Sequence, residues 1–273
     1  MKILYATDGS SSAREAGLFL ARLKLCAADQ IRILVVDESP GDAAIAEIVE
    51  ESRNIFSGSA AAIDTLEAQG YADEEILAAC QQWPADMVVI GAKGATGLKR
   101  FLLGGVTSRI LRHAPCSVLV VRSGKPLSHR ILGAFDDSHS SRDAALFLAS
   151  LPFAETPELE LVSVLPPLDP QAPQRHPSTF PSGVSEIQVI EDLSTYEARL
   201  LAAGCRVSTK ILRGDPAGAL IDYAEARQAD LIVLGSHGSS LSERFHRFLL
   251  GSVSEKVARY ASGNVLVVRH PGE

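Results

Sequence analysis

The sequence predicts an α/β fold built from two doubly wound domains, each with a five-stranded parallel sheet. Short apolar runs alternate with amphipathic helical patterns along the 273 residues, and this alternation is typical of a parallel sheet flanked by helices. Runs such as Val118–Val121 are apolar at consecutive positions, which suits strands that are covered on both faces. Segments of the first half also recur in the same order in the second half, which indicates a duplicated domain.

The duplication predicts the domain boundaries. We expect one domain at residues 1–122 and a second at residues 130–270, joined by the short polar linker Ser123–Pro126. Such a short linker should hold the two halves side by side. The clearest repeated pairs are residues 3–10 with 131–138, residues 88–94 with 232–238, and residues 118–122 with 265–269.

Each half contains five apolar runs that predict strands. In the first half the predicted strands are Lys2–Thr7, Ile31–Val36, Ala62–Leu66, Met87–Ile90 and Ser117–Val121. In the second half they are Arg130–Phe135, Glu158–Val164, Arg206–Leu212, Leu231–Leu234 and Asn264–Val268. The first strand of each half leads into a helix through a tight turn that contains an aspartate.

An apolar stripe with the spacing i, i+3, i+4, i+7 marks the helix after each first strand. The two stripes are Ala16, Phe19, Leu20 and Leu23 in the first half and Ala144, Phe147, Leu148 and Leu151 in the second. Ser12 with Glu15, and Ser140 with Asp143, resemble capping boxes. We therefore expect the two helices to begin at these serines.

Composition argues against several classes of function. The chain has 26 lysines and arginines against 33 acidic residues, and neither half is basic, so we expect no nucleic-acid partner. The amino terminus lacks the charged segment and the apolar core of a signal peptide. No apolar stretch is long enough to cross a bilayer. We therefore expect a soluble cytoplasmic protein with no membrane partner. The four cysteines lack CxxC spacing and the seven histidines lack metal-ligand spacing, which predicts reduced core thiols, no metal site and no catalytic set.

The most informative motif follows the fourth strand of the first half. Two glycines spaced GxxG are followed, after nine residues, by a glycine pair at the start of a helix. Glycines permit positive φ and let backbone N–H groups approach an anion, and a helix start directs further N–H groups and its positive dipole end to the same point. The spacing predicts a phosphate cradle. Its residues are Gly91, Gly94, Gly104, Gly105, Val106 and Thr107.

The second half repeats this arrangement with a different spacing. Gly235 and Gly238 are followed, after twelve residues, by Gly251 and Ser252. Neither copy is a Walker A loop, because GxxxxGK[ST] is absent, and no GxGxxG follows a first strand. The motif recurs in both halves, each time after a buried strand and before a helix. A ligand site explains this recurrence better than a turn without function does.

An aspartate at the carboxyl end of the first strand is the other candidate. Asp8 and its counterpart Asp136 should lie at the crevice where open α/β sheets bind ligands. A carboxylate there can accept hydrogen bonds from a ribose hydroxyl or a base amino group. Capping of the following turn is the alternative role, and the sequence alone leaves both open.

Taken together, these segments resemble the universal stress protein family, in a tandem form with two family domains in one chain. The resemblance covers the whole chain except Pro166–Gly183, a proline-rich stretch that is interpreted either as a surface insertion or as a lid over the second site. The matching segments are Ala6–Ser10, Val35–Glu38, Gly91–Gly94, Gly104, Val118–Arg122, Gly214–Ala217, Gly235–Gly238, Gly251–Val253 and Val265–Arg269.

The resemblance implies an adenine-nucleotide-binding fold and divides the family into members that bind ATP and members that do not. Nucleotide-binding relatives carry G-x2-G-x9-G-[S/T] and hold the adenosine with the aspartate and with backbone groups at the end of the second strand. The corresponding positions are Asp8 and Val35 in the first half, and Asp136 and Val164 in the second. Relatives dimerise through the last strand, so the resemblance implies that the matching last strands of this chain pair internally as a pseudo-dimer; a further homodimer stays open.

Each half departs from the nucleotide-binding motif in its own way. The first has Gly105 where the hydroxyl residue belongs, which removes one hydrogen bond to phosphate, worth roughly 1.5–3 kcal/mol. The second keeps Ser252 but has three extra residues before Gly251, so that either the glycine is displaced or the loop bulges outward. The sequence favours the first half, because displacement would remove several interactions and a missing hydroxyl removes one.

We therefore expect a stress-response regulatory protein that binds ATP or another adenine nucleotide, foremost in the first half, and that contacts protein partners the sequence does not identify. Asp8 could hold Mg²⁺ beside the phosphates. The alternatives are a structural or partner-binding stress protein without nucleotide affinity, and a slow ATPase. Efficient turnover would need a water-orienting group that the sequence does not reveal.

Overall fold

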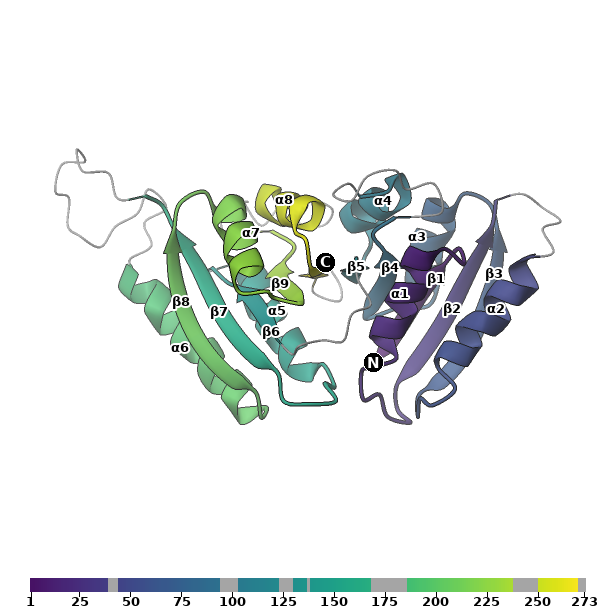
Figure 1. Ribbon diagram of the computed structural model, residues 1–273, viewed down its shortest axis with the longest axis horizontal. Coiled ribbons are helices and arrows are strands. Elements are labelled where there is room, and N and C mark those ends of the chain that lie inside the picture. Colours follow the sequence, from purple (N-terminus) through teal and green to yellow (C-terminus); the bar gives the residue numbers. More distant parts are fainter. Residues whose placement is uncertain are drawn as a thin grey trace.

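The computed structural model describes residues 1–38, 44–93, 103–122, 130–136, 138–167, 186–237 and 250–269. Within these residues the two halves form one ten-stranded sheet (Figure 1), with the strand order β3-β2-β1-β4-β5-β10-β9-β6-β7-β8. Pairing is parallel within each half and antiparallel only between β5 and β10. The predicted α/β class is confirmed.

Ten strands occur where the apolar runs predict them. In the first half they are β1 (Lys2–Thr7), β2 (Gln30–Asp37), β3 (Ala62–Gln69), β4 (Met87–Gly91) and β5 (Ser117–Val121). In the second half they are β6 (Arg130–Ala134), β7 (Glu158–Leu165), β8 (Arg206–Arg213), β9 (Leu231–Gly235) and β10 (Asn264–Val268). Most of the differences from the prediction are strand ends that extend further, because hydrogen bonding to a neighbour continues past the apolar run.

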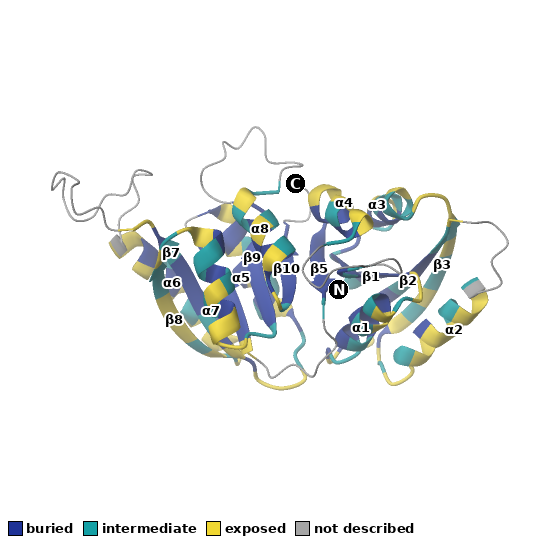
Figure 2. Ribbon diagram, turned by 45° about the horizontal axis from the view of Figure 1, so that its top comes forward, coloured by how far each residue is buried: buried dark blue, intermediate teal, exposed yellow. Residues whose placement is uncertain are grey.

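Helices cover both faces of the sheet. The described helices are α1 (Ser11–Leu20), α2 (Ala44–Ile55), α3 (Ala72–Gln82), α4 (Gly105–His113), α5 (His139–Ser150), α6 (Glu186–Ala202), α7 (Pro216–Ala226) and α8 (Ser252–Tyr260). One core lies under α1, α2, α5 and α6, and the other lies under α3, α4, α7 and α8. The central strands are buried along their length (Figure 2), as expected for strands covered on both faces.

The predicted apolar stripes pack against the first of these cores. Ala16, Phe19 and Leu20 are buried on α1, and Ala144 and Leu148 are buried on α5. The cysteine prediction is correct only in part, because Cys80 and Cys116 are buried whereas Cys26 is exposed. The contact of Cys80 with the Cys116 thiol, together with burial, raises the pKa of Cys80, which favours its neutral form.

The last strands of the two halves pair with each other. Val118, Leu119 and Val120 of β5 lie opposite Val267, Leu266 and Val265 of β10. This antiparallel contact is the one expected from the matching sequences, and it removes two apolar edges from solvent. The linker Ser123–Pro126 lies outside the described residues.

An arginine at the end of each last strand reaches a helix of the other half. The Arg122 guanidinium donates to the carbonyl oxygens of Ala261 at 2.8 Å, Arg259 at 3.1 Å and Ala258, at the end of α8. Arg269 donates to the carbonyl oxygens of Leu111 at 2.8 Å and Arg112 at 3.1 Å, near the end of α4. Positive charge is favourable at a helix carboxyl end. Burial lowers the pKa of Arg122 to about 10, so the group is still charged at neutral pH.

Candidate functional site

The strand order places a crevice at the carboxyl end of the first strand of each half. β1 lies between β2 and β4, and β6 lies between β7 and β9, so the chain leaves each first strand in one direction and returns on its other side. Open α/β sheets bind ligands at this switch point. Asp8 directly follows β1, and Asp136 lies two residues beyond β6, so both predicted aspartates are positioned at the crevice.

The two aspartates have different surroundings. Asp8 is exposed, and one of its oxygens accepts a hydrogen bond from the Ser10 N–H at 3.0 Å. The corresponding oxygen of Asp136 accepts from the Ser138 N–H at 3.0 Å, from the Ser141 hydroxyl at 2.7 Å and from the Ser138 hydroxyl. Three donors hold the Asp136 carboxylate in one orientation, which preorganises its second oxygen for a ligand.

The helices that follow these aspartates begin earlier than predicted. Their N-caps are Ser10, whose hydroxyl accepts from the Ala13 N–H, and Ser138, whose hydroxyl accepts from the Ser141 N–H. The expected capping serines, Ser12 and Ser140, bond elsewhere, because each faces the loop after the fourth strand of its half. The Ser12 hydroxyl accepts from the Lys93 N–H at 3.2 Å, and the Ser140 hydroxyl donates to the carbonyl oxygen of His237.

This close contact explains the first glycine of each motif. A Cβ at Gly91 would lie 2.7 Å from the carbonyl carbon of Ser12, and a Cβ at Gly235 would lie 2.8 Å from that of Ser140. Positive φ is found at other glycines of the described chain and not at Gly91 or Gly235. These two glycines therefore serve close packing and not an unusual backbone conformation: they let a helix start approach a strand end.

The glycines directly before α4 and α8, Gly104 and Gly251, occupy equivalent positions. The Gly104 N–H donates to the Ala92 carbonyl oxygen at 2.9 Å, and the Gly251 N–H donates to that of Ser236 at 2.7 Å. Both glycines are N-caps with nearly equal backbone angles, φ −63° and ψ 160° for Gly104, and φ −64° and ψ 149° for Gly251. The three extra residues of the second half therefore leave the start of α8 in place, and the reason for favouring the first half does not hold.

A buried hydroxyl in the first turn of each helix ties it to the preceding strand. Thr107 donates to the carbonyl oxygen of Gly91 at 2.9 Å, and Ser254 donates to that of Gly235 at 2.7 Å. Thr107, a predicted site residue, therefore has a structural role for its side chain. Val106 is 37% exposed beside it.

Both helix starts lack a side-chain cap. The N-caps of α1, α5 and α7 use a serine or aspartate side chain, whereas the glycine N-caps of α4 and α8 supply none. N–H groups at a helix start need a partner, and an anion is a suitable one. Ser252 adds an exposed hydroxyl at the first position of α8, where α4 has Gly105.

The strand register corrects one predicted residue by one position. Ala6 pairs with Leu34 and Ala134 pairs with Val162, so Val164 corresponds to Val36 and not to Val35. The Gly70 N–H donates to the carbonyl oxygen of Asp37, so the backbone groups of Asp37 face β3. Backbone groups two residues apart in a strand face the same neighbour, so those of Val35 face β3 as well. A one-residue slip turns a strand residue to the other side, and the sequence alone could not fix this register.

Val164 itself fits the predicted role. The Phe135 N–H donates to the Val162 carbonyl oxygen at 2.9 Å, so the backbone of Val162 faces β6. Two residues further, the backbone groups of Val164 face the same way, beyond the last register pair of β6 and β7. They point into the crevice that contains Asp136.

A cavity of about 480 Å³ joins these elements in the second half. Of the predicted residues there, Asp136, Val164, Gly235, Gly251 and Ser252 line it, and Gly238 lies outside the described residues, as does Gly94 in the first half. The volume is within the usual range for small-molecule sites. Ser141 and His237 also line the cavity. Sequence reasoning missed both, although His237 lies within the glycine motif.

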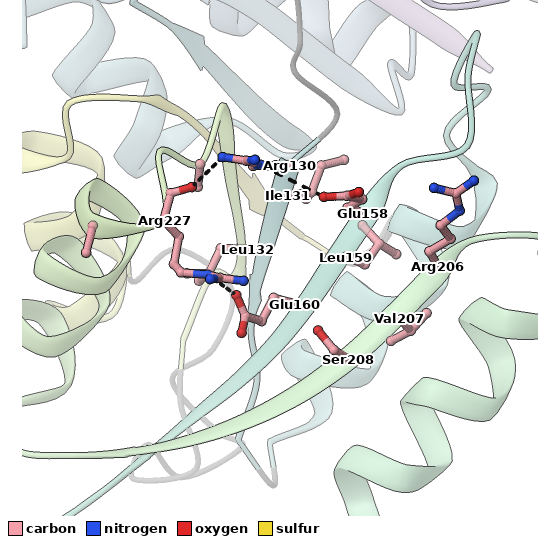
Figure 3. Close-up of a pocket in the computed structure, with 12 residues that line it drawn as sticks. Arg130, Ile131, Leu132, Glu158, Leu159, Glu160, Arg206, Val207, Ser208 and Arg227 are labelled. Carbon is pink, nitrogen blue, oxygen red and sulfur yellow. Dashed lines mark hydrogen bonds and ion pairs between the residues drawn. The ribbon is translucent and has the colours of Figure 1, made fainter.

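A second cavity, of about 360 Å³, opens at the opposite ends of β6, β7 and β8 (Figure 3). Its charged groups largely pair with one another: the Arg227 Nε lies 2.9 Å from a Glu160 carboxylate oxygen, and the Arg130 Nε lies 3.9 Å from one of Glu158. None of the predicted site residues lines this cavity, and it lies at the ends of the strands away from the switch point.

The described residues contain no group of three or more His, Cys, Asp or Glu side chains placed to hold a metal ion. Among the described helices, none has the length and apolar character that a membrane span requires.

The fold and the second-half cavity define a doubly wound α/β protein with a cavity at the carboxyl ends of its strands. The chain belongs to the universal stress protein family, since the family model matches residues 1–122 and again residues 128–269. Its structure is similar to the crystal structure of a universal stress protein from Archaeoglobus fulgidus, with a TM-score of 0.68 and 22% identity, covering 99% of this chain and 98% of that one. At that identity the likeness concerns the fold.

Curated relatives agree with this membership. A universal stress protein of Mycolicibacterium smegmatis is 32% identical over 195 residues, which cover 68% of this chain and 62% of that protein. Universal stress protein Slr1230 of Synechocystis is 29% identical over 186 residues, which cover 67% of this chain and 58% of that protein. These alignments span less than two thirds of either relative.

Proposed function

We propose that this protein binds an adenine nucleotide, ATP or a close relative, in the cavity of the second half. The observation that carries the proposal is the convergence in one cavity of Asp136, the backbone of Val164 and the uncapped start of α8. The first two offer acceptors and donors to an adenosine. The third offers N–H donors and a positive dipole end to phosphates.

The apolar lining suits the base. Val162, Leu220 and Leu234 line the cavity together with the polar groups, and small-molecule sites combine an apolar wall with a few placed polar groups. We place the adenosine between Val164 and Asp136 and the phosphates at Gly251 and Ser252. The bound nucleotide would then alter the contacts of the protein with its partners during a stress response.

The first half is the weaker candidate of the two. Asp8, Gly104 and Gly105 repeat the arrangement, but Gly105 supplies no hydroxyl to a phosphate. The preference for the second half reverses the expectation from the sequence, and it rests on the undisplaced position of Gly251. A Mg²⁺ ion would be held through the nucleotide phosphates, with Asp136 or Asp8 as the nearest carboxylate of each half.

Equilibrium binding of labelled ATP tests the proposal. We expect saturable binding to the wild-type protein at cellular ATP concentrations and a loss of affinity of about tenfold or more in Asp136→Ala, since a hydrogen bond to a charged group contributes about 1.5–3 kcal/mol. Asp8→Ala is the matched control and should retain that binding. Absence of saturable binding would favour a partner-binding stress protein without nucleotide affinity.

Product formation in the same samples separates binding from hydrolysis. Repeated turnover that survives further purification and disappears in Asp136→Ala would identify a slow ATPase. We expect binding without multiple turnover, because efficient hydrolysis needs a group that orients the attacking water, and the two titratable side chains that line the described cavity, Asp136 and His237, are here assigned to ligand binding.

A further inference from the structure

His237 is the titratable group of the second cavity that the proposed adenosine contacts leave unused. It follows Gly235 and Ser236 at the end of β9, at the position that Lys93 has in the first half. It is only 7% exposed and lines the same cavity as Gly251 and Ser252. Each half thus has a basic residue at this point of the cradle, and only in the second half is it a histidine.

The hydrogen bond of the imidazole is compatible with both of its charge states. The Ser236 hydroxyl lies 2.9 Å from His237 Nδ1. A hydroxyl can donate to the bare nitrogen of a neutral imidazole and can accept from the N–H of an imidazolium. Gain of a proton at Nδ1 therefore changes the charge of His237 without breaking this contact, and in the tautomer whose Nδ1 is bare Nε2–H is a donor before and after.

The described lining of the cavity contains one other titratable side chain. Of the groups that line it from β6, β7, β9, α5, α7 and α8, only Asp136 is also titratable. Its carboxylate is held by Ser138 and Ser141. Arg244, His246 and Arg247 lie outside the described residues, so the experiment must separate their effects from that of His237.

We propose that His237 binds the phosphates of the nucleotide in the second half, and that its protonation strengthens this binding as the pH falls. The inference rests on the proposed function. An imidazolium adds the attraction between opposite charges to its hydrogen bond with phosphate, which a neutral imidazole does not supply. Histidine changes charge between about pH 5 and 8, whereas lysine stays charged throughout that range. The second half would therefore respond to acidification, and the first half would not.

The sign follows from linkage. If the imidazolium binds the nucleotide more tightly than the imidazole does, the nucleotide must in turn raise the pKa of His237. Binding then takes up a proton near neutral pH. The gain in affinity is complete below the pKa that His237 has in the free protein. It is lost as the pH rises through the pKa that His237 has in the complex.

The test measures ATP affinity at about pH 5.5 and about pH 8 in an Asp8→Ala background, which leaves the second half as the remaining site. Three chains are compared: this background alone, with His237→Gln, and with His237→Lys. The ATP phosphate titrates in the same range, as does His246, and the glutamine variant corrects for both. We expect affinity to rise about tenfold more on acidification in the background chain than in its His237→Gln variant, and His237→Lys to bind tightly at both pH values.

An equal pH response in the background chain and in His237→Gln overturns the inference and leaves the proposed function intact. Absence of saturable binding at both pH values overturns both. A measurement on the wild-type chain does not depend on how the variants fold: the imidazole proton resonance of His237, followed by NMR, should titrate about one pH unit higher with nucleotide than without. An unchanged midpoint in a nucleotide-saturated sample would also refute the inference.

Discussion

The two halves share one scaffold and differ in what they place at the same point. In both, a serine after the first strand packs against the glycine that ends the fourth strand, and a glycine N-cap begins the next helix at the same hydrogen-bonded position. The first half then presents Lys93 and Gly105, and the second presents His237 and Ser252. The comparison shows that the position of the cradle is fixed by packing, while its chemistry depends on a few residues free to vary.

The same contrast applies to the aspartates. Ser141 donates to Asp136 at 2.7 Å, whereas the first half has Ala13 at the corresponding place, three residues after the N-cap. Duplication lets one copy change without loss of the common core. We infer that the halves have diverged in ligand affinity while each still supports the fold of the other through β5 and β10.

The largest expected effect on stability comes from removing a contact between the two halves. Arg122→Met removes the donor to three carbonyl oxygens of the other half and should lower the free energy of unfolding by about 3 kcal/mol, since each buried acceptor left unpaired costs about 1–3 kcal/mol. Chemical denaturation measures this. Arg269→Met should act similarly on α4, and a loss below about 1 kcal/mol in both variants would show that the arginines do not hold the halves together.

A smaller effect on stability should distinguish Gly235, which packs against a helix start, from Gly105 of the predicted phosphate cradle. Gly235→Ala places a methyl group 2.8 Å from the Ser140 backbone and should destabilise the protein by about 1–3 kcal/mol. Gly105→Ala meets no atom within 4 Å and should be neutral or stabilising by up to about 1 kcal/mol. Denaturation of the pair checks the comparison, and equal losses would contradict it.

Exchange of the cradle residues should sharpen the difference in affinity. Ser252→Gly removes a hydroxyl from the second cavity and should weaken nucleotide binding there by about tenfold. Gly105→Ser adds one where no atom obstructs it and should strengthen binding in the first half by a similar factor. Each is measured by calorimetry with the other half disabled at its aspartate. Unchanged affinity in both variants would show that the hydroxyl does not contribute to nucleotide binding.

The smallest expected effect is at the rim of the contact between the halves. Arg112 and Glu255 form an ion pair between α4 and α8, with side chains that are 49% and 31% exposed. Exposed pairs contribute about 0–1 kcal/mol, so Arg112→Met should change the free energy of unfolding by less than about 1 kcal/mol. A loss as large as that of Arg122→Met would show that exposed charge, and not the buried arginine, joins the halves.

The sequence predicts the fold well because its signals are local. Consecutive apolar residues and helical stripes identify every strand and the helices after β1 and β6. The sequence predicts the aspartates and glycines of the site for the same reason. The β5–β10 pair is not local, and it is expected only from the resemblance to relatives that dimerise through the last strand. The failures concern spatial neighbours: the register that replaces Val35 with Val36, the N-caps two residues before Ser12 and Ser140, and the position of Gly251 after a longer loop. Each depends on contacts between distant segments.

The central claim is that the second half binds nucleotide better than the first. Calorimetric titration of ATP into Asp8→Ala, which retains the second site, and into Asp136→Ala, which retains the first, compares the two directly in the full chain. The account predicts binding about tenfold tighter in Asp8→Ala. Tighter binding in Asp136→Ala would contradict it. The better site would then be in the first half, which the motif spacing alone favours.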